Sequence, residues 1–131
     1  MIRVEELMIG DWVNIMVEGY DNPTQIKEIG PFWVKVTQDE KDYGIVLIEP
    51  IPITPEILER NGFESVKNIF GFKTYKLNDD FILEDRGKRK CLCRSCYTMQ
   101  PYSTFWVCDI EHVNELQHAL KLCGISKNIE L

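Results

Sequence analysis

Apolar and polar residues alternate along the first third of the chain. Within residues 11–17, Val13, Ile15 and Val17 fall on one side of an extended backbone, which is the pattern of a strand with one buried face. Further strands are predicted over the ranges 25–29, 32–37 and 44–49. Short strands joined by tight turns form a meander, and a meander of this length curls to hide its edges. We therefore expect residues 1–50 to form a small antiparallel β-barrel of the Src homology type.

A proline-rich linker, Pro50-Ile51-Pro52-Ile53, follows this region. It excludes both a helix and a central strand, because proline donates no backbone hydrogen bond. Thr54 is a predicted N-cap and Pro55 a predicted first helical residue. Asn61-Gly62 ends this helix after two turns, so packing has to stabilise it.

The second half of the chain also predicts strands followed by a helix. The strands are expected at 72–77, 81–84, 90–97 and 104–108. From Asp109 to Gly124, apolar residues recur at helical spacing and form one stripe. The stripe consists of Val113, Leu116, Ala119, Leu120 and Cys123. Asp109 is the predicted N-cap, and Gly124 the predicted left-handed residue after the last turn. Residues 51–131 are therefore expected to form a linker helix, an antiparallel sheet and a helix that closes it, either as a separate subdomain or as one compact domain with residues 1–50. The fold class is α+β.

The composition is that of an ordinary folded domain. The chain has 131 residues, of which 44% are hydrophobic and 27% charged, and no run approaches the roughly 20 apolar residues of a membrane span. Five cysteines without a secretion signal predict reduced thiols and a cytoplasmic location. The net charge of −6 argues against general affinity for nucleic acid or an anionic membrane.

The positive charge is concentrated in one predicted hairpin. Five basic residues, with no acidic one between them, lie within nine positions: Arg86, Lys88, Arg89, Lys90 and Arg94. The rest of the chain therefore carries −11. Such a hairpin can contact phosphates, but basic side chains at a hairpin also deter edge-to-edge pairing in water. Nucleic-acid binding through residues 86–94 is therefore kept as the alternative function.

The cysteines suggest a metal site that the strand pattern argues against. Cys93 and Cys96 have C-x2-C spacing, and Cys108 and His112 have C-x3-H spacing, which a structural zinc site can use. In a regular strand, however, Cys93 and Cys96 point to opposite faces. We therefore expect buried thiols that act as small hydrophobic residues, with no cofactor.

A thiol enzyme is a further alternative. Lys90 and Arg94 would lower the pKa of a neighbouring cysteine, and His112 would act as the base. No nucleophile turn, phosphate-binding loop, Ser-His-Asp set or H-E-x-x-H motif accompanies them. The aromatic residues at strand spacing, including Phe32 and Trp33, are interpreted as core.

Three stretches together carry a family resemblance. They are E-E-L-M-I-G-D-W-V (5–13), I-E-P-I-P-I-T-P-E-I-L-E-R-N-G-F (48–63) and I-E-H-V-N-E-L-Q-H-A-L (110–120). In this order they resemble an uncharacterised family of small proteins from Bacteroides-type bacteria, their phages and mobile elements. That family usually has Tyr where His112 stands and His where Asn114 stands, and its members lack these cysteines. The resemblance implies a lineage and no activity.

These observations favour a non-enzymatic binding or accessory module of phage or mobile-element origin. Its expected partner is an unidentified protein, and neither a metal nor another cofactor is expected. The alternative is a nucleic-acid-associated protein that uses the basic hairpin.

Overall fold

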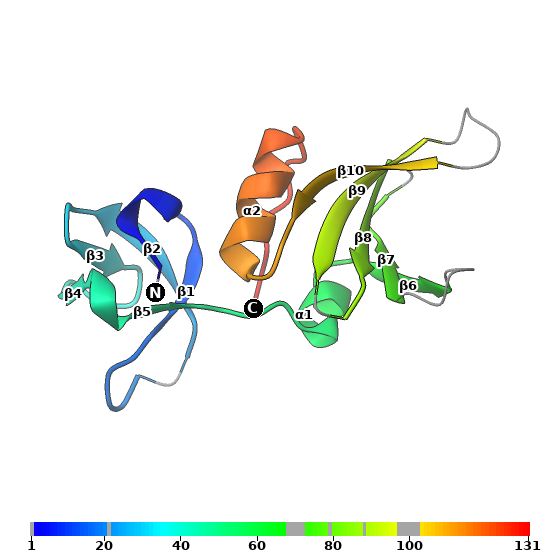
Figure 1. Cartoon of the computed structure of the whole chain (residues 1–131). Helices are drawn as coiled ribbons and strands as arrows, with labels where there is room; N and C mark the ends of the chain where they lie inside the picture. Colours follow the sequence, from blue (N-terminus) through cyan, green and yellow to red (C-terminus); the bar gives the residue numbers. More distant parts are fainter. Residues whose placement is uncertain (1, 21, 68–72, 79, 88, 97–102) are drawn as a thin grey trace. The chain divides into compact units, whose positions relative to one another are not determined.

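The computed structural model describes the chain apart from residues 1, 21, 68–72, 79, 88 and 97–102. The fold is α+β, with two five-stranded antiparallel sheets and two α-helices in the described residues (Figure 1). The chain divides into two compact units. Unit 1 comprises Met1–Pro52 and His112–His118, and unit 2 comprises Ile53–Glu111 and Ala119–Leu131.

Unit 1 contains a sheet of five short strands in the order β4-β3-β2-β1-β5. The strands are β1 (Trp12–Ile15), β2 (Thr24–Ile29), β3 (Trp33–Val36), β4 (Asp42–Gly44) and β5 (Ile48–Pro50). Alternation explains their burial, because Val13 and Ile15 of β1 are buried while Trp12 and Asn14 are only partly covered. The predicted strands at 11–17, 25–29 and 32–37 are therefore confirmed in type and differ by one or two residues at their ends.

One predicted strand of unit 1 is wrong. The range 44–49 was expected to be a single strand, but the chain makes a 3₁₀ turn at Ile45–Leu47 between β4 and β5. The turn connects the two edge strands of the sheet, because β4 pairs only with β3 and β5 pairs only with β1 among the described strands. Among the described strands no pairing joins β4 to β5, so a closed barrel is not found.

The core of unit 1 consists of one cluster of buried apolar side chains. Its members are Ile2, Leu7, Val13, Ile15, Ile26, Val34, Val36, Tyr43 and Ile48. Strands β1, β2, β3 and β5 supply Val and Ile to this cluster, and β4 supplies Tyr43. The β-branched side chains of Val and Ile pack well on the pleated surface of a sheet. Val34 and Val36 point into this cluster, so Trp33 and Lys35, which alternate with them on β3, lie on the other face of the sheet.

Unit 2 begins with the predicted linker helix, α1 (Pro55–Arg60). The Thr54 hydroxyl accepts a hydrogen bond from the Ile57 backbone N–H at 3.3 Å, which confirms the N-cap. Asn61 follows the helix and is buried, and its side chain joins it to the C-terminal segment. Its amide donates to the Glu130 carbonyl at 2.8 Å and its amide oxygen accepts from the Glu130 N–H at 2.7 Å.

The sheet of unit 2 has the strand order β10-β9-β8-β7-β6. The strands are β6 (Glu64–Lys67), β7 (Lys73–Lys76), β8 (Phe81–Asp85), β9 (Lys90–Cys96) and β10 (Ser103–Asp109). Each strand pairs with the next along the chain, so the sheet is an antiparallel meander. Four of the strands were predicted, and β6 was missed because E-S-V-K lacks a continuous apolar face.

The second helix, α2 (Val113–Leu122), confirms the predicted apolar stripe. Val113, Leu116 and Leu120 are at most 1% exposed, whereas Leu122 is 89% exposed. Gly124 follows the last turn at φ +74°, as predicted for a left-handed cap. The described residues include no helix that is long and apolar enough to span a membrane.

One prediction about the final helix is corrected. Asp109 is not its N-cap, because Asp109 ends β10 and the helix begins at Val113. The first half of the helix groups with unit 1 and the residues from Ala119 onward group with unit 2. The polar contacts of Gln117 and His118 described below explain this grouping.

The burial of α2 predicts which truncations lower stability. Leu116→Ala and Leu120→Ala should each reduce the free energy of unfolding by about 2–5 kcal/mol, because each removes a fully buried side chain. Leu122→Ala should change it by less than about 0.5 kcal/mol. Denaturant titrations of the three variants and the parent provide the measurement. Equal midpoints for all four proteins would show that the stripe contributes nothing to the folded core.

Candidate binding surface

The basic hairpin is partly neutralised by its own sheet. The Arg86 guanidinium donates to the Glu84 carboxylate at 2.8 Å, and Glu84 is buried. The Arg89 guanidinium donates to Asp109 at 2.8 Å. In each case the carboxylate raises the pKa of the arginine, so the arginine stays protonated. Its positive charge is already paired with a carboxylate of the same chain.

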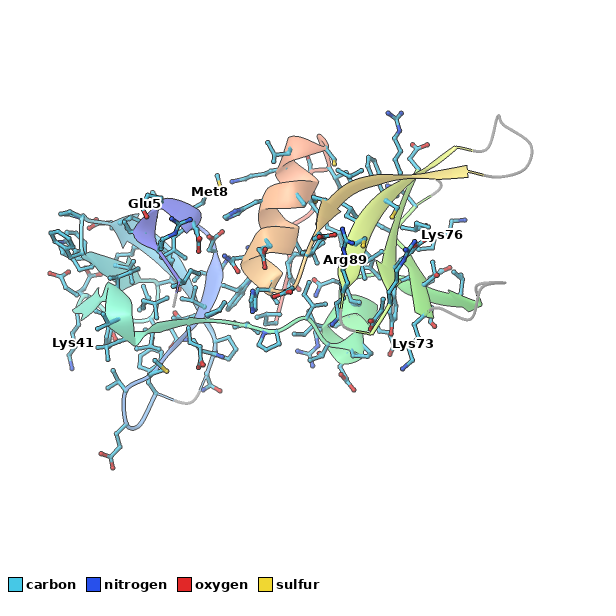
Figure 2. The ribbon with its side chains drawn as sticks, viewed as in Figure 1. Glu5, Met8, Lys41, Lys73, Lys76 and Arg89 are labelled. Carbon is cyan, nitrogen blue, oxygen red and sulfur yellow. The ribbon has the colours of Figure 1, made fainter. Side chains whose placement is uncertain are left out.

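The other two described residues that were predicted to contact phosphate, Lys90 and Arg94, differ in their exposure. Lys90 is partly buried and lies opposite Asp85 in the β8–β9 register, while Arg94 is exposed opposite Phe81. Lys88 lies outside the described residues. Exposed basic residues also occur elsewhere in unit 2, such as Lys73 on the neighbouring strand β7 (Figure 2). The sheet therefore carries basic residues on several strands, and half of the described hairpin set is paired with carboxylates.

Four of the five cysteines lie on the paired strands β9 and β10. Strand β9 runs without interruption from Lys90 to Cys96, and Cys93 is buried on it. Cys93 pairs with Trp106 and Cys96 with Ser103, while a bulge places Cys108 opposite Leu92. The described residues contain no group of three or more His, Cys, Asp or Glu that could hold a metal. The Cys96 side chain lies outside the described residues.

The local environment makes the two central thiols weak nucleophiles. Burial raises the pKa of Cys93 to about 11 and also raises the pKa of Cys91, whose thiol donates to Asp109 at 3.5 Å. The lowered pKa that the thiol-enzyme alternative requires is therefore not found for Cys91 and Cys93. Among the described residues, the ring of His112, which precedes α2, lies 2.9 Å from the carboxylate of Glu115 on that helix, and no thiol is its partner.

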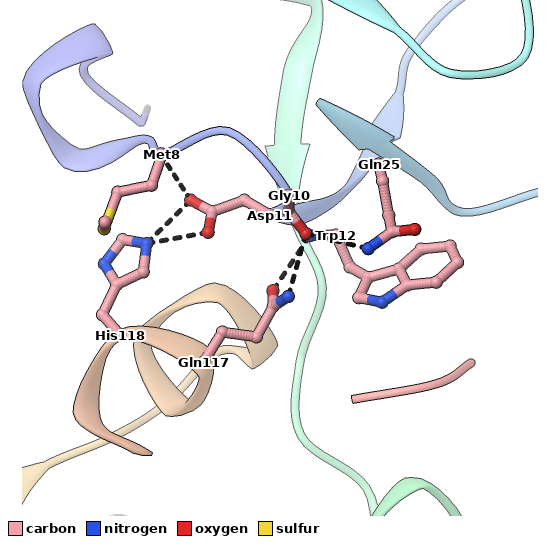
Figure 3. Close-up of polar contacts among 7 residues, drawn as sticks. All are labelled: Met8, Gly10, Asp11, Trp12, Gln25, Gln117 and His118. Atoms are coloured by element: carbon pink, nitrogen blue, oxygen red, sulfur yellow. Dashed lines mark hydrogen bonds and ion pairs between the residues drawn. The ribbon is translucent and has the colours of Figure 1, made fainter. Parts of the chain in front are cut away.

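A polar network in unit 1 was not foreseen from the sequence. The Asp11 carboxylate is buried, and both of its oxygens lie 2.8 Å from His118 Nε2 (Figure 3). One of them also accepts from the Met8 N–H at 2.8 Å. Beside this pair, Gln117 accepts from the Trp12 N–H and donates to the Gly10 carbonyl, both at 3.0 Å. Two successive residues of α2 therefore bond to the segment that leads into β1.

This network joins the first half of α2 to residues 10–12. A histidine beside a carboxylate is a possible general base, but a nucleophile or substrate group must also be within reach. The Asp11 carboxylate bonds to His118 and to the Met8 N–H, and the amides of Gln25 and Gln117 donate to the neighbouring Gly10 carbonyl (Figure 3). The sequence signal was limited to the polar face of a helix, which ordinarily faces water.

Trp33 forms a flat aromatic surface on the outer face of the unit 1 sheet. Gly44 lies directly opposite Trp33 on β4, and Gly30 closes the β2–β3 turn by donating its N–H to the Trp33 carbonyl at 2.8 Å. A Cβ on Gly30 would lie 2.2 Å from Trp33 Cε2, so the indole rests directly on this glycine. The two glycines leave the ring without neighbouring side chains at these positions, and it is partly exposed.

Phe32 and Val46 extend this apolar surface. Phe32 occupies the β2–β3 turn and is 77% exposed, so its interpretation as a core residue is wrong. Its carbonyl accepts from the Ile45 N–H at 2.9 Å, which places the 3₁₀ turn beside it. Val46 of that turn is 61% exposed, and its side chain approaches Gly44, the partner of Trp33. Phe32, Trp33 and Val46 are called the aromatic surface below.

A row of charges adjoins the aromatic surface. Glu28, Lys35 and Asp42 lie opposite one another on β2, β3 and β4. Lys35 Nζ is 3.9 Å from Glu28 and 3.8 Å from Asp42, and 5.9 Å from the centre of the Trp33 ring. One ammonium group thus serves two carboxylates that are both more than half exposed. The row has one negative charge in excess.

The raised pKa of the buried thiols predicts slow alkylation. At pH 8, a pKa of about 11 leaves on the order of one Cys93 side chain in a thousand as thiolate, and burial limits access further. Iodoacetamide should therefore modify Cys93 in the native protein much more slowly than the partly exposed Cys123. The Cys93 rate should rise with pH up to about 11. Mass spectrometry gives the rates, and the protein unfolded in urea is the control, in which the two thiols should react alike. Equal rates in the native protein would contradict this account.

Comparisons with known proteins identify no relative of this chain. No protein-family model matches the sequence, and neither the curated proteins nor the solved structures contain a significant match.

Proposed function

We propose that this chain is a non-enzymatic binding or accessory module that contacts a protein partner through the aromatic surface of unit 1. The proposal includes the cytoplasmic location and the phage or mobile-element lineage expected from the sequence. Its main support is that Phe32 and Val46 are exposed and Trp33 is partly exposed at neighbouring backbone positions, on the start of β3 and the two turns beside it.

Single exposed apolar residues are common on protein surfaces, but adjacent ones call for an explanation. Phe32 and Trp33 are also of the residue types that dominate protein interfaces, because aromatic rings cover a large area with few rotatable bonds. The indole of Trp33 is already held against Gly30. Little side-chain entropy would therefore be lost when a partner covers it.

The architecture of unit 1 agrees with this proposal. We infer that unit 1 is the small Src-homology-type barrel expected for residues 1–50. Support comes from the strand order β4-β3-β2-β1-β5 and from the 3₁₀ turn at Ile45–Leu47, which separates the last two strands. The aromatic surface is formed by the β2–β3 turn, the start of β3 and this 3₁₀ turn. Tight turns on a sheet hold exposed side chains in a fixed arrangement, which favours binding.

The proposal predicts a loss of partner capture when the aromatic surface becomes polar. Phe32→Ser combined with Val46→Ser should abolish retention of a host protein that the immobilised parent retains. Leu122→Ser is the matched control, because Leu122 is 89% exposed and lies at the end of α2. Extracts of the native host, passed over the three immobilised proteins and analysed by quantitative mass spectrometry, provide the comparison. Identical sets of retained proteins on all three would refute the proposal.

Nucleic-acid binding through residues 86–94 remains the second candidate, and the pairing of Arg86 and Arg89 with carboxylates weighs against it. We predict only weak binding of labelled single- and double-stranded DNA at near-physiological salt, with strong salt dependence. Titrations with the parent and with a variant that replaces Arg86, Lys88, Arg89 and Lys90 by Gln provide the test. Sub-micromolar binding by the parent that this variant loses would make nucleic acid the preferred partner.

A further inference from the structure

The two units differ sharply in charge. Unit 1 contains eleven Asp and Glu residues and four Lys and Arg residues, which gives it a formal charge of −7. Unit 2 contains ten acidic and eleven basic residues, which gives it +1. The aromatic surface therefore belongs to the unit that carries the negative charge. Such a unit attracts cationic partners and repels anionic ones.

Part of the negative charge of unit 1 is balanced locally. Glu6 is paired with Arg3 at 3.1 Å, and Glu40 is paired with Lys27. Each of these pairs has one acid and one base. The row beside Trp33 differs, because Glu28 and Asp42 share Lys35. An incoming cation can therefore pair with one of these carboxylates while Lys35 stays with the other.

The position of Lys35 shows that a cation is compatible with the indole. Its ammonium group lies 5.9 Å from the centre of the Trp33 ring, within the range in which the ring attracts a positive charge. A guanidinium or ammonium group from a partner would meet the same combination of carboxylate and aromatic ring. Apolar side chains next to that group would meet Phe32 and Val46.

We propose that the aromatic surface and the Glu28–Lys35–Asp42 row together bind a protein segment in which Lys or Arg residues alternate with apolar side chains. This inference rests on the proposed function and specifies the chemistry of the partner. The apolar side chains of the segment cover Phe32, Trp33 and Val46, and its basic side chains pair with Glu28 and Asp42. An acidic segment with the same apolar residues is excluded by repulsion.

Three short fluorescent peptides with the same apolar residues test this inference. They differ only in having Arg, Gln or Glu at the remaining positions, and fluorescence anisotropy at low salt measures their binding to the full chain. The Arg peptide should bind most tightly, the Gln peptide more weakly, and the Glu peptide not measurably. Added salt should weaken the binding of the Arg peptide and leave that of the Gln peptide nearly unchanged.

Variants distinguish the effect of the Glu28–Lys35–Asp42 row from the effect of the total negative charge of unit 1. Glu28→Gln combined with Asp42→Asn should weaken binding of the Arg peptide about three- to tenfold and leave the Gln peptide unaffected. The matched control is Glu5→Gln combined with Glu18→Gln, which removes two exposed carboxylates from other elements of unit 1 and should have a smaller effect. Phe32→Ser combined with Val46→Ser should weaken the Arg and Gln peptides alike.

The outcomes distinguish this inference from the proposed function. Equal binding of the Arg and Gln peptides, lost in the Phe32→Ser, Val46→Ser variant, would overturn the inference and leave the proposed function supported. Equal effects of the two carboxylate double variants would overturn it as well, because total charge alone would then explain the preference. Absence of binding by all three peptides would also overturn it, while the capture experiment would still decide the proposed function.

Discussion

The burial of the Asp11 carboxylate is the constraint on which the arrangement of unit 1 depends. A buried carboxylate is strongly destabilising unless hydrogen bonds and a positive or polar partner replace its water. Here the partners are the Met8 N–H and His118, which is 107 residues away in the chain. This requirement joins the segment before β1 to the first half of α2, and Gln117 adds two bonds to Gly10 and Trp12. The C-terminal part of the chain therefore completes the N-terminal unit.

The features predicted correctly from the sequence are those with local causes. Alternation predicted β1, β2 and β3, because the period of two is set by the strand itself. Thr54 and Pro55 predicted the start of α1, since a cap depends only on residues within one turn. The stripe of α2 was likewise predictable, and Leu122 was correctly placed off it. These patterns indicate which face of an element is buried, but they do not indicate which other segment packs against that face.

The features that were missed depend on contacts between distant residues. His118 was assigned to the polar face of a helix, and nothing near it in the chain indicates that it pairs with Asp11. Asp109 was taken for a helix cap because its contact with Arg89, just before β9, is not visible in the sequence. The surface around Trp33 was missed because one flanking glycine, Gly30, lies in the β2–β3 turn and the other, Gly44, lies 14 residues further along on β4. The Gly30-Pro31 break was the one local sign that Phe32 would lie in a turn and not in the core.

Folding also changes which charges are available for binding. In the sequence, residues 86–94 are the most obvious charged segment, but Arg86 and Arg89 are held by Glu84 and Asp109 of the same sheet. The acidic residues of unit 1 appear dispersed in the sequence, yet β-sheet pairing aligns Glu28 and Asp42 on either side of one lysine. A charge that already has a partner must give it up before binding another, whereas the excess carboxylate beside Trp33 has no such cost. The chemistry available to a partner is therefore set more by the cross-strand register than by the density of charge along the chain.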